Sequence, residues 1–334
     1  MQANDSVAKN KAGISVRNRR KEKRRQAAEL KSKTSIWRRI GRNYELYIFL
    51  IPAVVYTAIF LYGPMYGVLM AFKDYNMLEG VMGSPWVGLK HFERFFTGYN
   101  FWSTLSNTLL LSLYYLAATL PLPVILAIIF NNVKNGIFKK TVQLAAYAPN
   151  FISVVVLVGI MKIVFAPDTG VFNILAEKIF HVETADVFGR PEYFRHLYVW
   201  SGVWQTLGWN SIIYVAALSG ISPELYEACT VDGANRLQKI RYLEIPSILP
   251  TVVIVLILNT GTIMNIGFEK VYLMQTPLNL AVSETLPTYL YKMGVINNDY
   301  SLATAVGFFN SAVSCILLVI VNQVAKKLSD SSLF

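Results

Sequence analysis

The sequence contains few of the residue combinations that carry out catalysis. Its three histidines, His91, His181 and His196, lack the HExxH spacing of a zinc site. No phosphate loop of the form GxxxxGKS or GxxxxGKT and no serine elbow of the form GxSxG is present. Cys229 and Cys315 are predicted to lie too far apart for a disulfide. We therefore expect no catalytic residues, no metal site and no cofactor bound by this chain, so any nucleotide must be hydrolysed by another chain.

Polar side chains are concentrated instead inside two apolar stretches. Amides and hydroxyls are costly in lipid and usually face a cavity or another helix. Indole rings and amides also suit the ring faces and hydroxyls of a sugar, and Gln205 and Trp209, four residues apart, share one helical face. The alternative is packing or hydrogen bonding between helices, with tryptophan at the membrane surface. The candidate pathway residues are Trp204, Gln205, Trp209 and Asn210 in the first stretch, and Asn259, Thr262 and Asn265 in the second.

The segment 222–246, between these two stretches, is polar and charged. Ser222 is a candidate N-cap, Pro223 suits the first helical position, and Gly233 is placed to end the helix. A second helical segment follows the glycine and is predicted to stop at Pro246. The pattern therefore predicts a helix, a glycine turn and a helix outside the bilayer.

The first of these two helices has an apolar face formed by Leu225, Ala228 and Cys229. Exposure of such a face to water is costly unless another surface covers it. That surface belongs either to a partner protein or to the chain's own transmembrane helices, and the sequence leaves both possibilities open.

The composition is that of a membrane protein. Hydrophobic residues make up 54% of the chain and charged residues 15%, and the mean hydropathy is +0.41. A membrane-spanning helix needs roughly 20 mostly apolar residues. Prolines in the sequence LPLP (120–123) and at Pro149 are expected to kink their helices. We predict an all-α integral membrane protein with six transmembrane helices, at 47–72, 105–130, 142–165, 197–221, 247–268 and 301–325.

The distribution of Lys and Arg predicts the orientation of these spans. Residues 1–43 hold 14 of the 31 Lys and Arg residues and three acidic residues, for a net charge of +11. Basic residues also dominate the loop 131–140, whereas acidic residues outnumber basic ones in the connection 166–196. Because basic flanks are retained in the cytoplasm, we expect both termini and the segment 222–246 to lie there.

Three regions follow from this organisation. The basic cytoplasmic tail lacks aromatic residues for stacking on bases until Trp37, so anionic lipid is its expected partner and nucleic acid is not. The regions are the tail at 1–43, whose end contributes to a candidate helix at 34–47 lying on the inner membrane surface, the six-span domain at 44–328, and a cytoplasmic C-terminal tail at 329–334.

The polar segment resembles the EAA loop of ATP-binding-cassette importer permeases. The pattern of that loop is E-A-A, three residues, G, nine residues and I-x-L-P, and the sequence here reads EACTVDGANRLQKIRYLEIP. The resemblance extends from about residue 44 and implies the type I permease fold, also called MetI-like. The stretch 270–295 is similar to the branch that handles complex oligosaccharides, including aldouronate and alginate permeases. The loop matches at Glu227, Ala228, Gly233 and Pro246, and departs from the second alanine at Cys229.

This resemblance implies one half of an importer in the bacterial cytoplasmic membrane. A second permease subunit would complete the pathway as a heterodimer, two cytoplasmic ATPase subunits would bind ATP and Mg, and an extracytoplasmic solute-binding protein would deliver an oligosaccharide. The EAA helix is then expected to seat in a groove of the ATPase, where a basic side chain would meet its glutamate. The implied coupling residues are Leu225, Glu227, Ala228, Cys229, Asp232, Gly233 and Pro246.

Three other functions are compared with this one. A permease for a non-carbohydrate solute is the alternative within the same family. An ion-coupled secondary transporter would need ionisable residues at mid-membrane, and the predicted spans contain almost none apart from Lys162. A membrane enzyme would need a cluster of acids, bases or nucleophiles, and the spans contain no such cluster.

Overall fold

The computed structural model describes residues 44–134, 136–181 and 186–328, and every regular element in these ranges is a helix. The chain divides into two compact units, unit 1 (Met1–Tyr66) and unit 2 (Gly67–Phe334). The basic tail, the beginning of the candidate surface helix and the C-terminal tail lie outside the described residues.

The described part of unit 1 is the beginning of the first predicted span. It consists of α3 (Tyr44–Tyr56), η1 (Thr57–Tyr62) and α4 (Gly63–Met65), and the helical run goes on through η2 (Tyr66–Phe72). No side chain of α3, η1 or α4 is buried, and large apolar side chains such as that of Phe49 are exposed. A helix that is apolar on all sides is suited to contact with lipid or with other membrane helices.

Unit 2 contains long helices joined by short helical segments. In chain order its elements are α5 (Gly80–Gly83), α6 (Lys90–Phe96), α7 (Phe101–Thr119), α8 (Pro121–Asn132), α9 (Ile137–Tyr147), η3 (Ala148–Phe151), α10 (Val154–Val164), α11 (Val171–Phe180), α12 (Pro191–Ser219), α13 (Pro223–Val231), α14 (Arg236–Lys239), η4 (Ile240–Glu244), α15 (Ile245–Gly261), α16 (Phe268–Met274), α17 (Leu280–Ser283), α18 (Leu286–Tyr291), η5 (Lys292–Ile296) and α19 (Tyr300–Leu328).

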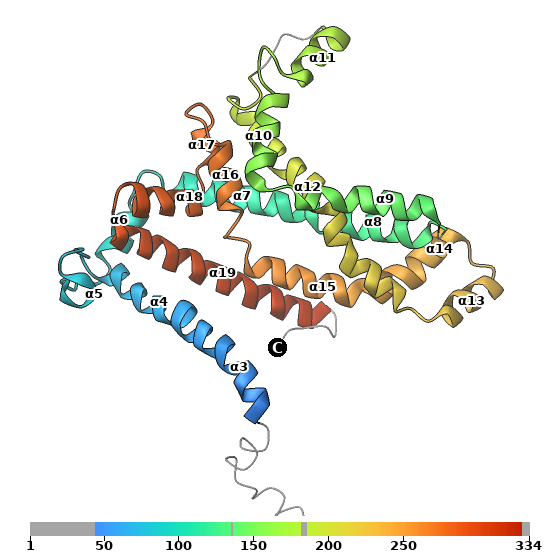
Figure 1. The fold of residues 1–334 in the computed structure, drawn as a ribbon, viewed down its shortest axis with the longest axis horizontal. Coiled ribbons are helices and arrows are strands. Elements are labelled where there is room, and N and C mark those ends of the chain that lie inside the picture. Colours follow the sequence, from blue (N-terminus) through green and yellow to red (C-terminus); the bar gives the residue numbers. More distant parts are fainter. Residues whose placement is uncertain (1–43, 135, 182–185, 329–334) are drawn as a thin grey trace, which may run out of the picture. The chain divides into compact units, whose positions relative to one another are not determined.

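Helix α12 is at the centre of unit 2 and packs against α7, α8, α9 and α15. Helices α15 and α19 run side by side, and α19 also contacts α6 and α18 (Figure 1). The close packing of α12 on α9 requires a glycine, because a Cβ atom at Gly208 would lie 2.1 Å from the backbone oxygen of Ala146. Within unit 2, the short helices α13 and α14 lie at the opposite end from α6 and α18 (Figure 1).

The third predicted span is broken near its proline. Pro149 lies in η3, and the helical runs Ile137–Phe151 and Val154–Val164 meet at an angle of 98°. The predicted kink at this proline is therefore confirmed. The side chain of Ser153 caps the second run by accepting a hydrogen bond from the Val156 N–H at 3.3 Å. At LPLP the helix assignment changes from α7 to α8, and both belong to one apolar run.

The number of apolar helices is smaller than predicted. Counting only described residues, four helical runs are long and apolar enough to cross a membrane, and the bent pair raises the number to at most five. Helix α12 has 29 residues, but its amide, hydroxyl and indole groups make it less apolar than the others. The predicted count of six is thus not confirmed. The four runs are Tyr44–Phe72, Phe101–Asn132, Arg236–Gly261 and Tyr300–Lys327.

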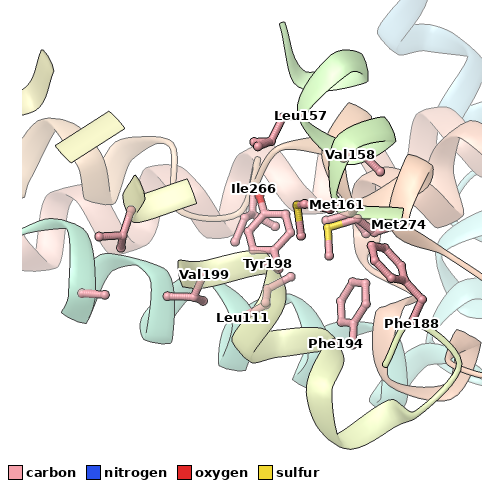
Figure 2. Close-up of a cluster of buried hydrophobic side chains, with 13 residues drawn as sticks. Leu111, Leu157, Val158, Met161, Phe188, Phe194, Tyr198, Val199, Ile266 and Met274 are labelled. Carbon is pink, nitrogen blue, oxygen red and sulfur yellow. The ribbon is translucent and has the colours of Figure 1, made fainter. Parts of the chain in front are cut away.

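The largest buried apolar cluster joins four helices of unit 2. It contains Leu111 of α7, Met161 of α10, Tyr198 of α12 and Met274 of α16, whose side chains converge in Figure 2. Ile266, from the segment between α15 and α16, belongs to the same cluster. In a membrane bundle such side chains stabilise the fold through close van der Waals packing. The cluster therefore fixes the positions of the elements that enclose the cavity described below.

Candidate solute cavity and coupling unit

A cavity of about 680 Å³ lies between α7, α12, α15 and the segment leading into α16. Its lining combines amide and hydroxyl groups with aromatic rings. Two of the residues predicted to line a pathway, Asn210 and Asn259, are exposed and form no side-chain hydrogen bond with the residues that the structure describes. Their amides are therefore unpaired within the described chain and line the cavity. The predicted residues that line this cavity are Gln205, Asn210, Asn259, Thr262 and Asn265.

Two of these cavity residues also hold the helices together. The side-chain N–H of Gln205 donates to the backbone oxygen of Ile152 at 2.7 Å, at the break between η3 and α10. The side-chain oxygen of Asn265 accepts from the amide of Asn310 on α19 at 2.6 Å. Such bonds satisfy polar groups that would be costly if left unpaired in an apolar surrounding. Gln205 and Asn265 therefore take part in hydrogen bonding between helices, the alternative raised by the sequence, although both also line the cavity.

The two tryptophans predicted for this pathway lie elsewhere. Trp204 lines a second, largely apolar cavity of about 650 Å³ between α10, α11 and α12. Trp209 packs edge-on against Phe151, with ring centroids 5.9 Å apart, and is absent from the lining of both cavities. The bend after α9 brings Phe151 against Trp209, which is 48% exposed, so a pathway role for the two tryptophans stays a prediction. The helical spacing of Gln205 and Trp209 could not show that contact.

Several cavity residues were not predicted from the sequence. Tyr115 and Thr119 come from α7, a stretch whose polar groups were not considered as pathway candidates. Phe268, Glu269 and Lys270 come from the start of α16. An available signal was the pair of adjacent ionisable residues directly after the fifth apolar stretch, because charges near a membrane interior often have a function.

Lys270 is the buried cation of the cavity wall. The residue is 6% exposed, and its Nζ donates to the backbone oxygen of Tyr198 at 2.9 Å. The same Nζ lies 4.8 Å from the centre of the Tyr198 ring. Because burial removes the ammonium group from water, the pKa of Lys270 is lowered to about 8. Gly202 provides the space for this arrangement, since a Cβ atom there would lie 2.7 Å from Tyr115 Cε2 and 3.2 Å from Lys270 Nζ.

The first helix of the predicted coupling unit forms as expected. Ser222 caps α13 by accepting from the Glu224 N–H at 3.3 Å, and Pro223 occupies its first turn. Gly233 follows with φ +75°, a conformation that favours glycine. Leu225 is 49% exposed. The apolar face of α13 is therefore largely uncovered within the described chain.

The second helix of the unit does not end at its proline. Asn235 and Gln238 form a capping box at the start of α14, and the helical run continues through η4 and α15 to Gly261. In η4 the backbone N–H of Ile245 donates to the oxygen of Ile240, a π-type bond. Pro246 then falls in the first turn of α15, where its missing N–H is tolerated. The fifth apolar helix thus begins inside the coupling unit.

A buried carboxylate connects this unit to α8. Glu244 is 1% exposed, and its oxygens accept from the amides of Asn131 at 2.8 Å and Asn132 at 3.0 and 3.1 Å. The Tyr226 hydroxyl of α13 donates to the same carboxylate at 3.3 Å. Arg236 at the start of α14 donates to the backbone oxygen of Asn132. Three elements therefore meet at Glu244, which sequence analysis did not single out because it occupies the variable position of I-x-L-P.

Comparison with known proteins identifies relatives over nearly the whole chain. The polygalacturonan/rhamnogalacturonan transport system permease protein YteP of Bacillus subtilis (strain 168) is 39% identical over 304 residues, covering 91% of this chain and 94% of the relative. Protein LplB of the same organism is 39% identical over 295 residues, covering 88% and 92%. A chain in the crystal structure of a bacterial alginate ABC transporter, in complex with an alginate pentasaccharide-bound periplasmic protein, is 34% identical, with a TM-score of 0.83, covering 89% and 99%.

A family description matches residues 124–330, more than half of the chain. The match includes the coupling unit and every element from α9 to α19. Family, fold and relatives agree with the permease resemblance seen in the sequence, and the role is that of a transport subunit and not of an enzyme. The chain therefore belongs to the binding-protein-dependent transport system inner membrane component family.

Proposed function

We propose that this chain is a permease subunit of an ATP-binding-cassette importer for oligosaccharides. It would form half of the transmembrane pathway, with a second permease subunit as the other half and two ATPase subunits on the cytoplasmic side. A solute-binding protein would deliver the sugar from outside. The names of the relatives, which refer to polygalacturonan, rhamnogalacturonan and alginate, support a carbohydrate over another class of solute.

The cavity between α7, α12 and α15 is the observation that carries this proposal. Tyr115 and Phe268, both partly exposed, supply aromatic rings that can pack on the apolar faces of sugar rings. The free amides of Asn210 and Asn259 can exchange hydrogen bonds with hydroxyl groups. Apolar walls with a few converging polar groups are typical of sites that bind small solutes.

The exposed face of α13 supports docking of an ATPase. Leu225, on the apolar face of α13, is 49% exposed, and Val231 and Glu227, on other sides of the helix, are also exposed. Isolated apolar side chains are common on surfaces. Here they occur on a capped helix whose Tyr226 hydroxyl donates to Glu244, and Glu244 also accepts from Asn131 of α8. An apolar contact with one central charge is a common form of protein interface. ATP and Mg would then be bound by the partner and not by this chain.

The proposed orientation places α13 in the cytoplasm and the connection before α12 outside. Because basic flanks remain inside, we expect single cysteines at Asp168 and Val231 to react with an impermeant maleimide from opposite sides. Both positions are exposed. The experiment uses a variant in which Cys229 and Cys315 are replaced by alanine. Labelling at Asp168→Cys alone in intact cells is expected, and equal labelling of both positions would contradict this orientation.

The experiment that tests transport uses the whole importer in proteoliposomes with its ATPases and binding protein. Asn210→Ala and Asn259→Ala should each slow oligosaccharide uptake by about five-fold, the effect of losing a hydrogen bond worth about 1 kcal/mol. The affinity of the binding protein should not change. Asn297→Ala, an exposed amide outside the cavity, is the matched control. Unchanged uptake by both cavity variants would show that these two residues do not contact the solute. Failure of the unmodified importer to take up any oligosaccharide would overturn the proposed function.

A further inference from the structure

The ammonium group of Lys270 has donors that the described residues leave unused. An ammonium has three N–H donors, and here one of them donates to the Tyr198 backbone oxygen. Among the described residues no carboxylate forms an ion pair with Lys270. Ion pairs among the described residues include Lys90–Asp74, His91–Asp74, Arg94–Asp299 and Lys292–Glu284.

Burial of an ammonium without a counter-ion is costly, so such a group is usually paired or used for binding. Lys292 shows the paired case in this chain, because its Nζ lies 2.6 Å from the carboxylate of Glu284. Lys270 has only a carbonyl and the face of an aromatic ring as its protein partners. Its side chain lines the cavity, so the remaining donors can reach an anion placed there.

We propose that Lys270 binds a carboxylate group of the solute, which makes the cavity selective for acidic oligosaccharides. This inference rests on the proposed function of oligosaccharide import. The carboxylate would supply the missing counter-ion, while Asn210 and Asn259 across the cavity bind hydroxyl groups of the same solute. Charge-assisted hydrogen bonds are roughly twice as strong as neutral ones, so the acid group would dominate recognition.

Glu269 precedes Lys270 and also lines the cavity, but the two side chains do not form an ion pair in the described structure. Glu269 is exposed, whereas Lys270 is buried. Its carboxylate is suited to accept hydrogen bonds from sugar hydroxyls.

A structural role for Lys270 must be separated from a binding role, because its bond to Tyr198 also joins α16 to α12. The experiment measures equilibrium binding of trigalacturonate and of its fully methyl-esterified form to the assembled importer in nanodiscs, without the solute-binding protein. The two probes differ in charge and share their sugar rings. Lys270→Met should weaken trigalacturonate binding by about tenfold and leave binding of the ester unchanged. Lys270→Arg should retain most of the acid binding, and Lys178→Met, which removes an exposed lysine outside the cavity, should not weaken it.

Two outcomes would overturn the inference. An equal loss of both probes in Lys270→Met would show that the residue only supports the cavity wall. Failure of the unmodified importer to bind trigalacturonate more tightly than its ester would show that the cavity does not select acids. If the same importer still takes up neutral oligosaccharides in proteoliposomes, the proposed function stands and only the acidic selectivity fails.

Discussion

We expect Gly233→Pro to abolish oligosaccharide uptake while the chain still inserts into the membrane. Gly233 has φ +75°, and proline is restricted to φ near −65°, so the turn that joins α13 to α14 cannot form in the variant. The substitution also removes the N–H that donates to the Thr230 oxygen at 3.1 Å. The exposed face of α13 would then be misdirected. Co-purification of the ATPase and solute-stimulated ATP hydrolysis should both fall by more than about tenfold, the loss expected when an interface loses about 2 kcal/mol or more.

The matched control for this variant is Gly233→Asn, because asparagine tolerates a positive φ better than other residues with a side chain. No atom lies within 4 Å of a Cβ atom built at Gly233, so the control introduces no clash. Uptake by Gly233→Asn should remain close to that of the unmodified protein. If Gly233→Pro keeps both its ATPase and its transport rate, then α13 is not the element that couples hydrolysis to transport.

The parts of the fold that sequence predicted well are those governed by local chemistry. The cap at Ser222, the first-turn proline of α13 and the end of that helix just before Gly233 each depend on residues within a few positions, and the structure shows all three. The bend near Pro149 has the same origin. Family and transport role were recognisable because the coupling unit carries a spaced motif and not a single residue.

Features that depend on distant contacts were predicted less well. Pro246 was expected to end a helix, but the π-type turn before it absorbs the missing hydrogen bond, and sequence patterns give no sign of that turn. Trp209 was assigned to the solute pathway by helical spacing, but the bend after α9 brings Phe151 against its ring, and Trp209 is 48% exposed outside the cavity lining. The prediction of six spans relied on the length of the apolar stretches. Helix α12 is long enough to cross a membrane, but the polar groups that it turns toward the cavity make it less apolar than the other runs.

The cavity itself was predicted in part. Spacing identified Asn210 and Asn259 because polar groups in apolar stretches are conspicuous. It did not identify Tyr115, because tyrosine is common in membrane helices and its role depends on the neighbouring α12 and on the space left by Gly202. Lys270 lies outside the apolar stretches, and only the fold of the segment after α15 brings it to the cavity wall.

The second large effect is expected at Glu244, the carboxylate shared by α8, α13 and η4. We expect Glu244→Gln to uncouple ATP hydrolysis from transport, because the amide replaces one of two acceptor oxygens that face the donors of Asn131, Asn132 and Tyr226. A hydrogen bond to a charged group contributes about 1.5–3 kcal/mol, so the link between α13 and α8 should weaken by about that amount. In proteoliposomes the ATPase should remain bound, while solute transported per ATP hydrolysed falls by about tenfold or more.

A charge swap separates this coupling role from a general loss of stability. Asn131→Asp alone would place a second carboxylate at the position whose amide now lies 2.8 Å from the Glu244 oxygen, so it should also impair transport through like-charge repulsion. In the double variant Glu244→Gln with Asn131→Asp, the carboxylate at position 131 faces the amide at position 244 and the Tyr226 hydroxyl, because acceptor and donor have exchanged sides. Transport per ATP should recover in the double variant above either single variant. Additive losses, or full coupling in Glu244→Gln, would show that the carboxylate does not transmit movement of α13 to α8.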